Sequence, residues 1–396
     1  MKKESLWSRD FILTMLSSSS SFFGVQILYP VLPLFLMELG ASPREMGFGI
    51  GLFTLSAVVA RPFTVWGSKR WGRFSMVILG TLITTLAIVS YYWTDSVITF
   101  LIPRISHGLG FGITTTIFAS VVSDILPKEQ RGEGMGYFGL GTSLSMMVSP
   151  FLGIWLVQTQ GFFPMFMTAT SAQVIAFGMI FAMSRKVWPS ITYHEGGSKT
   201  EPVSKDSWLP QKLWLPGLLT LLMGLGVGGI LGYSTVYAKV EGISGVEYFF
   251  LLSASFVFGI RFISGRIFDT KGPYWVFIPG AIFLVISAFL LSFGRTQWLF
   301  LLAGGLYGIG NGALFPALQA WTINRVAGEK RTGANALFYN CLDIGIGSGL
   351  ILLGHLADVT SYRTMYSLSG GIMVLFVVVC LLGRWLEKDK AYLEEE

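Results

Sequence analysis

The stretch Arg104-Ile105-Ser106-His107-Gly108-Leu109-Gly110-Phe111-Gly112 places three glycines at alternate positions inside a long apolar segment. The same glycine spacing returns 200 residues later, at Gly308, Gly310 and Gly312. In a chain with 48 glycines such a match could arise by chance, but chance would not also align arginines at the same offset. The other pairs with an offset of 200 are Arg61 and Arg261, Gly72 and Gly272, and Arg131 and Arg331. The sequence therefore predicts two parallel halves with one architecture.

The composition excludes a water-soluble protein. Charged residues make up 13% of the 396 residues and hydrophobic residues 52%, and the mean hydropathy is +0.63. Soluble domains carry about 25% charged residues, so charge is too scarce here to cover a water-facing surface. A chain this apolar can bury enough surface to fold, so intrinsic disorder is excluded. Its two cysteines, Cys341 and Cys380, lie in apolar runs, which excludes a disulfide scaffold.

Twelve apolar runs are each long enough to cross a bilayer, whose core of about 30 Å needs about 20 helical residues. They do not alternate as the strands of a membrane barrel do. The first run follows Lys2 and Lys3, but it is too long for a signal peptide. The expected spans are 11–37, 46–66, 74–93, 97–122, 134–157, 162–184, 213–238, 246–267, 274–293, 298–322, 333–357 and 364–384.

The distribution of positive charge predicts the orientation. With a cytoplasmic N-terminus, twenty of the 28 lysines and arginines lie in inside segments, four lie outside, and four lie within or at the ends of spans. The excess of inside charge places both termini in the cytoplasm. The expected fold is an all-α membrane protein with 12 transmembrane helices: an N-terminal six-helix bundle (1–184), a cytoplasmic linker (185–212) and a pseudo-symmetric C-terminal six-helix bundle (213–396).

The loop Gly265–Gly272 resembles the cytoplasmic Gly-x-x-x-Asp-x-x-Gly motif of the major facilitator superfamily. In that family the motif latches one conformation through charge–dipole and salt-bridge contacts. The first-half counterpart, 61–73, departs from the pattern, because Val65 and Lys69 stand where Gly and Asp are expected. The second half is thus the stronger latch candidate. The expected latch residues are Gly265, Arg266, Asp269, Gly272, Arg61 and Arg73.

Two more motifs resemble the drug–proton antiporter branch of the family. Arg104–Gly112 is similar to the Arg-x-x-x-Gly-x-Gly-x-Gly motif of proton-coupled members. The second motif resembles the antiporter hinge, with Ser149 in place of a glycine, and its hinge residues are Gly141, Pro150 and Gly153. The resemblance implies a secondary active transporter that works by alternating access, driven by the proton gradient and without a cofactor.

Charged groups deep in the membrane are candidates for proton coupling. Asp343 lies about ten residues, or about 15 Å, into its expected span. A charge near the midplane costs about 2.5–3.5 kcal/mol, which suggests a function. Arg104 and the less strongly indicated His107 are the other candidates. The structural alternatives are a neutral hydrogen-bonded acid, a carbonyl-bonded arginine near Pro103 and a packing histidine.

The resemblance implies that the first, fourth, seventh and tenth spans line the substrate cavity. The polar and aromatic residues expected there carry few fixed charges, which suits amphiphilic organic solutes better than simple ions. Any single tyrosine among them can equally serve packing. The expected cavity residues are Gln26, Tyr29, Tyr233, Tyr237, Asn311, Phe315, Gln319 and Asn340. Gly345, Gly347 and Gly349, which follow Asp343, are expected to let a neighbouring helix pack closely.

No catalytic constellation, phosphate loop or metal-ligand spacing is present in the sequence, so neither an enzyme, an ATP-driven pump nor a metal site is indicated. The leading hypothesis is a monomeric proton-coupled exporter of small amphiphilic molecules in the cell membrane. One alternative is a dedicated exporter of a single endogenous metabolite, such as a metallophore, lipid precursor or sugar. The non-transporter alternative is a ligand-binding membrane sensor. No nucleic-acid partner is expected.

Overall fold

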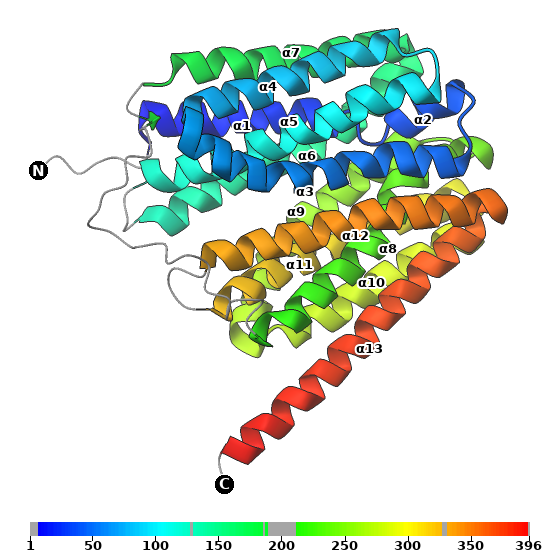
Figure 1. The fold of residues 1–396 in the computed structure, drawn as a ribbon. Coiled ribbons are helices and arrows are strands. Elements are labelled where there is room, and N and C mark those ends of the chain that lie inside the picture. The colour runs from blue at the N-terminus through cyan, green and yellow to red at the C-terminus, as the bar shows by residue number, and fades with distance from the viewer. Residues whose placement is uncertain (1–6, 127–129, 185–186, 189–210, 327–330, 395–396) are drawn as a thin grey trace, which may run out of the picture. The chain divides into compact units, whose positions relative to one another are not determined.

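The computed structural model describes residues 7–126, 130–184, 187–188, 211–326 and 331–394, and these are overwhelmingly helical (Figure 1). The expected linker, 185–212, lies largely outside these residues. The chain divides into two compact units. Unit 1 is Met1–Ala41 with Leu52–Gly196, and unit 2 is Ser42–Gly51 with Gly197–Glu396.

The helices follow the expected apolar runs. Those before the linker are α1 (Arg9–Gln26), α2 (Leu32–Glu38), α3 (Pro43–Trp71), α4 (Arg73–Ser90), η1 (Tyr91–Trp93), α5 (Val97–Ile125), α6 (Arg131–Gln160) and α7 (Phe162–Ala182). Those after it are η4 (Gln211–Leu213), α8 (Trp214–Val240), α9 (Val246–Lys271), α10 (Tyr274–Phe293), α11 (Gln297–Asn324), α12 (Arg331–Val359) and α13 (Tyr362–Glu394). Among the described residues, 11 helices are long and apolar enough to cross a membrane.

The first expected span, 11–37, is a broken helix rather than a continuous one. α1 ends at Gln26 and α2 begins at Leu32, with a proline in the first turn of α2. Five consecutive serines in α1 lower its hydropathy, and this segment is not among the 11 candidate spans. Two of these serine hydroxyls donate to α7: Ser17 to the carbonyl of Ala176 at 2.8 Å, and Ser20 to that of Ala172 at 2.7 Å.

Close helix packing confirms the 200-residue repeat. A Cβ added to Gly108 of α5 would lie 2.2 Å from the carbonyl oxygen of Phe53 in α3. A Cβ added to Gly308 of α11 would lie 2.2 Å from the carbonyl oxygen of Ser253 in α9. The partner carbonyls are themselves 200 residues apart. Glycine is therefore needed at both positions, because two backbones approach each other without room for a side chain.

The second glycine of each motif makes the equivalent contact with the next helix. A Cβ on Gly110 would lie 2.7 Å from the carbonyl oxygen of Gly80 in α4, and one on Gly310 would lie 2.6 Å from that of Gly280 in α10. α5 and α11 are thus each in backbone contact with two neighbours, which fixes a three-helix core in each unit.

α8 and α12 also meet through glycines, as expected from the glycines beside Asp343. In Figure 1, α8 lies alongside α12. A Cβ on Gly345 would lie 2.4 Å from the carbonyl oxygen of Leu221, and one on Gly349 would lie 2.6 Å from that of Leu225. These contacts confirm the predicted close packing for Gly345 and Gly349, and they fix the face that α12 turns toward α8.

Replacing Gly308 with Val tests the dependence of unit 2 on backbone contact. The new Cβ would start 2.2 Å from the carbonyl oxygen of Ser253, and overpacking costs about 1–3 kcal/mol or more. We expect a clear fall in the thermal unfolding midpoint of the purified protein. Gly259→Val in α9 is the control, because a Cβ at Gly259 meets nothing within 4 Å. Equal midpoints for the two variants would contradict the packing argument.

Candidate functional site

Arg104 lies at the centre of a polar cluster inside unit 1. Its side chain, in α5, is 1% exposed. The guanidinium carbon lies 4.4 Å from the centre of the Phe53 ring in α3, a cation–π geometry. Arg104 also interacts with the hydroxyl of Tyr91, which belongs to η1 at the end of α4. A charge buried to this extent needs such partners to offset its lost hydration.

His107 belongs to the same cluster, one turn along α5. It is 0% exposed, and its Nδ1 lies 3.0 Å from the Tyr91 hydroxyl. Its ring packs edge-on against Phe53, with 4.8 Å between the ring centres. Its Nε2 has no hydrogen-bond partner among the described residues. The structure therefore brings two predicted coupling residues, Arg104 and His107, together through Tyr91 and Phe53, which the sequence analysis did not select.

The repeat breaks down at this cluster. Positions 200 residues beyond Arg104, His107 and Tyr91 hold Gly304, Tyr307 and Leu291. The packing glycines of α5 and α11 match between the halves, whereas these polar side chains do not. The cluster is thus not required by the fold that the two halves share.

A second polar face joins α11 and α12 in unit 2. The side-chain amide of Gln319 donates to Asn335 Oδ1 at 2.9 Å and to the Tyr339 hydroxyl at 3.2 Å. The Phe315 ring, one turn before Gln319, lies 6.3 Å from that of Tyr339. All four side chains are half-buried. This face offers hydrogen-bond donors, acceptors and aromatic surface at one place.

Asn335 and Tyr339 were missed at the sequence level, although their spacing could have identified them. They lie four residues apart on α12, and Asp343 follows four residues later, so the three form one stripe. Asp343 and Asn340 are half-buried near the middle of α12. Asn311, also half-buried, extends the stripe of Phe315 and Gln319 along α11. The geometry thus places the predicted residues Phe315 and Gln319 against α12, and Asp343 lies on the α12 stripe that they meet.

The other predicted cavity residues lie elsewhere. Tyr233 and Tyr237 of α8 are 0% exposed. Their hydroxyls donate to the carbonyls of Leu350 at 2.9 Å and Gly294 at 3.2 Å. In this structure both side chains therefore serve packing, and their contact with a solute stays a prediction. Gln26 ends α1, Tyr29 lies in the break before α2, and both are half-buried.

An ion pair at the α3–α4 turn joins one predicted latch residue to an unpredicted partner. Arg73, at the start of α4, pairs with Asp124 near the end of α5. Because the α3–α4 turn and the end of α5 are expected on one side of the membrane, the acid at 124 was a detectable partner. The matching positions in the second half hold Pro273 and Asn324, which cannot form this pair.

The remaining predicted latch residues lie on α9, at its C-terminal end and on α3. Arg266 and Asp269 are exposed on α9, and neither forms an ion pair with another described residue. Gly265 is exposed on the same helix, and Arg61 is half-buried on α3. Gly272 has φ of +90° and separates α9 from α10. Latching by these residues stays a prediction.

The expected hinge residues pack α6 closely against α1. A Cβ on Gly141 would lie 2.3 Å from Ser19 Oγ, and one on Gly153 would lie 2.4 Å from the carbonyl oxygen of Ile27. Pro150 lies within α6 between them. These contacts agree with a close-packing motif, while bending at Pro150 stays a prediction.

The sequence matches the family model of the Major Facilitator Superfamily over residues 14–296 and 260–395. The chain belongs to this family. Members are transporters rather than enzymes, so this major facilitator is a multi-pass membrane protein that moves small molecules across a lipid bilayer.

Similar proteins cover nearly the whole length of this major facilitator. The quinolone resistance protein NorA of Staphylococcus aureus strain MSSA476 is 24% identical over 383 residues, which are 95% of this chain and 96% of NorA. The staphylopine export protein of Staphylococcus aureus strain Mu50 is 22% identical over 394 residues, covering 96% and 97% of the two chains.

Solved structures agree in fold. The crystal structure of the nucleoside transporter NupG has a TM-score of 0.73 at 12% identity, covering 95% of this chain and 99% of NupG. A POT family transporter in complex with a thioalcohol-conjugated peptide has a TM-score of 0.77 at 12% identity, covering 96% and 95%. At these identities the likeness concerns the fold alone.

Replacing Tyr91 with Phe tests the buried cluster of unit 1. The change removes the hydroxyl beside His107 Nδ1 and leaves a buried polar atom without that partner, which costs about 1–3 kcal/mol. We expect a lower thermal unfolding midpoint. Tyr92→Phe is the matched control, because the Tyr92 side chain is exposed. If Tyr91→Phe unfolds at the same temperature as the control, the cluster does not depend on this hydroxyl.

Proposed function

We propose that this transporter exports small amphiphilic organic molecules in exchange for protons. NorA, named for quinolone resistance, and the staphylopine export protein are similar to this chain along its whole length, which supports efflux. The observation that carries the proposal is Asp343, an acid near the middle of α12 on the stripe that begins with Asn335 and Tyr339. A carboxyl group at this depth can bind and release a proton beside a surface suited to a solute.

The polar face between α11 and α12 indicates the substrate class. Gln319 and Asn335 offer amide groups, and Tyr339 and Phe315 offer ring surface. A molecule with an apolar ring system and a few hydrogen-bonding groups would match this combination, because ligand sites pair mostly apolar walls with a few oriented polar groups. A small inorganic ion would leave the aromatic surface unused.

The proton gradient is the proposed source of energy, with no cofactor. At ~150 mV, one proton moving inward supplies roughly 3.5 kcal/mol. This sustains a substrate gradient of about 2.5 decades for each proton. In the proposed cycle Asp343 is protonated from outside, releases the proton inside and accepts substrate in its charged state. Arg104 and His107 are proposed to influence that exchange.

The proposed arrangement is a monomer in the cell membrane with both termini in the cytoplasm. The orientation rests on the charge distribution, with twenty basic residues in inside segments and four in outside segments. With this orientation the ion pair of Arg73 and Asp124 lies on the cytoplasmic side. The pair would then hold the cytoplasmic ends of α4 and α5 together during the cycle.

The first test measures proton-coupled movement of a fluorescent dye in everted membrane vesicles with a preset pH gradient. Asp343→Asn keeps the size and polarity of the side chain but cannot exchange a proton. We expect the dye-dependent collapse of the gradient to be lost, because a side chain that cannot exchange a proton cannot couple proton movement to the dye.

Asp358→Asn is the matched control, because Asp358 is an exposed acid on the same helix. It is expected to retain full coupling. Full coupling in Asp343→Asn would overturn the assigned role of Asp343 and would direct attention to His107. Absence of coupling in the unmodified protein with every dye would count against polyspecific antiport.

A second candidate function is the dedicated export of one endogenous metabolite. The observation that favours it is the staphylopine export protein, which matches this chain over as large a share as NorA does. Arg104 would also suit a carboxylated solute.

Competition between unrelated molecules separates the two candidates. Inhibition of the transport of one dye by many unrelated amphiphiles would support the polyspecific exporter. If only one chemical class competes, the dedicated exporter is favoured. Ligand binding with no flux in proteoliposomes would instead support a sensor.

A further inference from the structure

Unit 2 has a depression of about 420 Å³ at one end of its helices. It lies where α10 ends, where α13 begins and beside the short connection from α10 to α11. Its lining holds two arginines, three hydroxyl side chains, one phenyl ring and no acid. The lining residues are Ser292, Phe293, Arg295, Arg363, Thr364 and Ser367. This composition is that of a site for an anion with an apolar neighbour.

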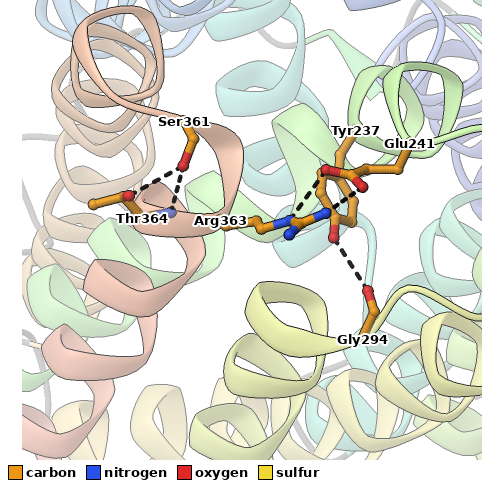
Figure 2. Close-up of polar contacts among 6 residues, drawn as sticks. All are labelled: Tyr237, Glu241, Gly294, Ser361, Arg363 and Thr364. Carbon is orange, nitrogen blue, oxygen red and sulfur yellow. Dashed lines mark hydrogen bonds and ion pairs between the residues drawn. The ribbon is translucent and has the colours of Figure 1, made fainter.

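The side chain of Arg363 is held in place by the carboxylate of Glu241, which is not part of the lining. Its Nη2 lies 2.5 Å from Glu241 Oε2, and its Nε donates to Glu241 Oε1 at 3.2 Å (Figure 2). The two contacts form a bidentate pair, which orients the guanidinium and offsets its charge. Arg363 also hydrogen-bonds the Tyr237 hydroxyl, so its donors are engaged within the protein. The net positive charge of the lining therefore comes from Arg295.

The connection that carries Arg295 is anchored at its first residue. The Tyr237 hydroxyl donates to the carbonyl of Gly294 at 3.2 Å (Figure 2). The Gly294 amide donates to the carbonyl of Leu290 at 2.7 Å. A Cβ at Gly294 would lie 2.5 Å from that same carbonyl oxygen, so the close turn needs glycine. Arg295 follows directly, with its side chain exposed and in no ion pair with a described residue.

Two hydroxyl groups of the lining are linked to each other, and the third is linked to Ser361 outside the lining. Ser292 Oγ lies 2.6 Å from Ser367 Oγ and donates to the carbonyl of Arg363 at 2.9 Å. Thr364 Oγ1 lies 3.1 Å from Ser361 Oγ. When Ser361 donates to Thr364, the hydroxyl hydrogen of Thr364 is left to donate to a ligand. The depression thus offers Thr364 as a neutral donor beside the arginines.

The depression lies at the ends of two candidate membrane spans, which is where we expect lipid headgroups. α10 (Tyr274–Phe293) and the apolar part of α13 (Tyr362–Trp385) are both candidate membrane spans, and the lining falls at their ends. Two aromatic side chains near this level are widely exposed, Phe293 at 77% and Trp298 at 80%. Exposed aromatic side chains at the ends of spans are typical of the membrane interface.

We propose that this depression binds the phosphate group of an anionic phospholipid. Arg295 supplies the unneutralised positive charge, the Thr364 hydroxyl donates a second contact, and Phe293 lies against the glycerol and upper acyl region. Arg363, held by Glu241 and Tyr237, forms the wall beside them. A lipid is favoured over a soluble phosphate ester because an exposed phenyl ring forms part of the lining. The site is separate from the α11–α12 polar face and does not depend on the transported substrate.

The test counts phospholipids retained by the purified, full-length protein in native mass spectra. The protein is first equilibrated with vesicles of equal parts phosphatidylglycerol and phosphatidylcholine. We expect the unmodified protein to retain phosphatidylglycerol preferentially. Arg295→Ala should lower that retention about tenfold, the effect of losing a charge-assisted contact of this kind, and Thr364→Val should lower it less. Both side chains lie at the surface, so both variants are expected to fold.

Arg44→Ala is the control, because Arg44 is an exposed arginine on the same expected side of the membrane and outside the lining. It should leave retention unchanged. Equal losses in Arg44→Ala and Arg295→Ala would overturn the proposal, since attraction would then be nonspecific. Unchanged retention in Arg295→Ala would also overturn it. Displacement of the lipid by millimolar glycerol phosphate, with no need for acyl chains, would identify a soluble phosphate ester as the ligand instead.

Discussion

Backbone contact between helices, made possible by glycine, is the constraint on which both units depend. In lipid, apolar side chains gain little by leaving one apolar environment for another, so helices associate through close packing and hydrogen bonds. Gly108 brings α5 against α3, and Gly308 brings α11 against α9, each at a distance that no Cβ tolerates. Both helices also touch a second neighbour through the next glycine of the motif. The polar groups of each unit are positioned by these cores.

The two halves share their packing glycines, so a polar residue that occurs in only one half is not explained by the shared fold. Arg104 and His107 have Gly304 and Tyr307 as their counterparts, and Asp343 has Ser143. Arg73 and Asp124, which form an ion pair, correspond in the repeat to Pro273 and Asn324. A fold that needed these charges for packing would keep them in both copies. Their restriction to one copy is consistent with the roles that we propose for them.

The span positions and the repeat could be predicted from the sequence, because apolar length and glycine spacing are local properties. The break between Gln26 and Leu32 was harder, since the apolar run continues across the prolines. Ser17 and Ser20 of α1 also donate to carbonyls of α7, a helix distant in the sequence. Partners across helices were missed for a related reason. Their spacing from Asp343 marks Asn335 and Tyr339 as one stripe, but the sequence alone does not show that Gln319 of another helix meets this stripe.

The tyrosines of the membrane spans show that residue type alone does not identify a cavity residue. Tyr233, Tyr237 and Tyr339 are all tyrosines within membrane spans, and the sequence favoured the first two as cavity residues. Tyr233 and Tyr237 direct their hydroxyls to backbone carbonyls, which are strong acceptors in an apolar interior. Tyr339 instead meets a side-chain amide on a half-buried face. A backbone carbonyl already satisfies the hydroxyl and needs no ligand, whereas a network of side chains can exchange its partners. We therefore base the proposed transport site on the half-buried side-chain network of Gln319, Asn335 and Tyr339 rather than on residue type alone.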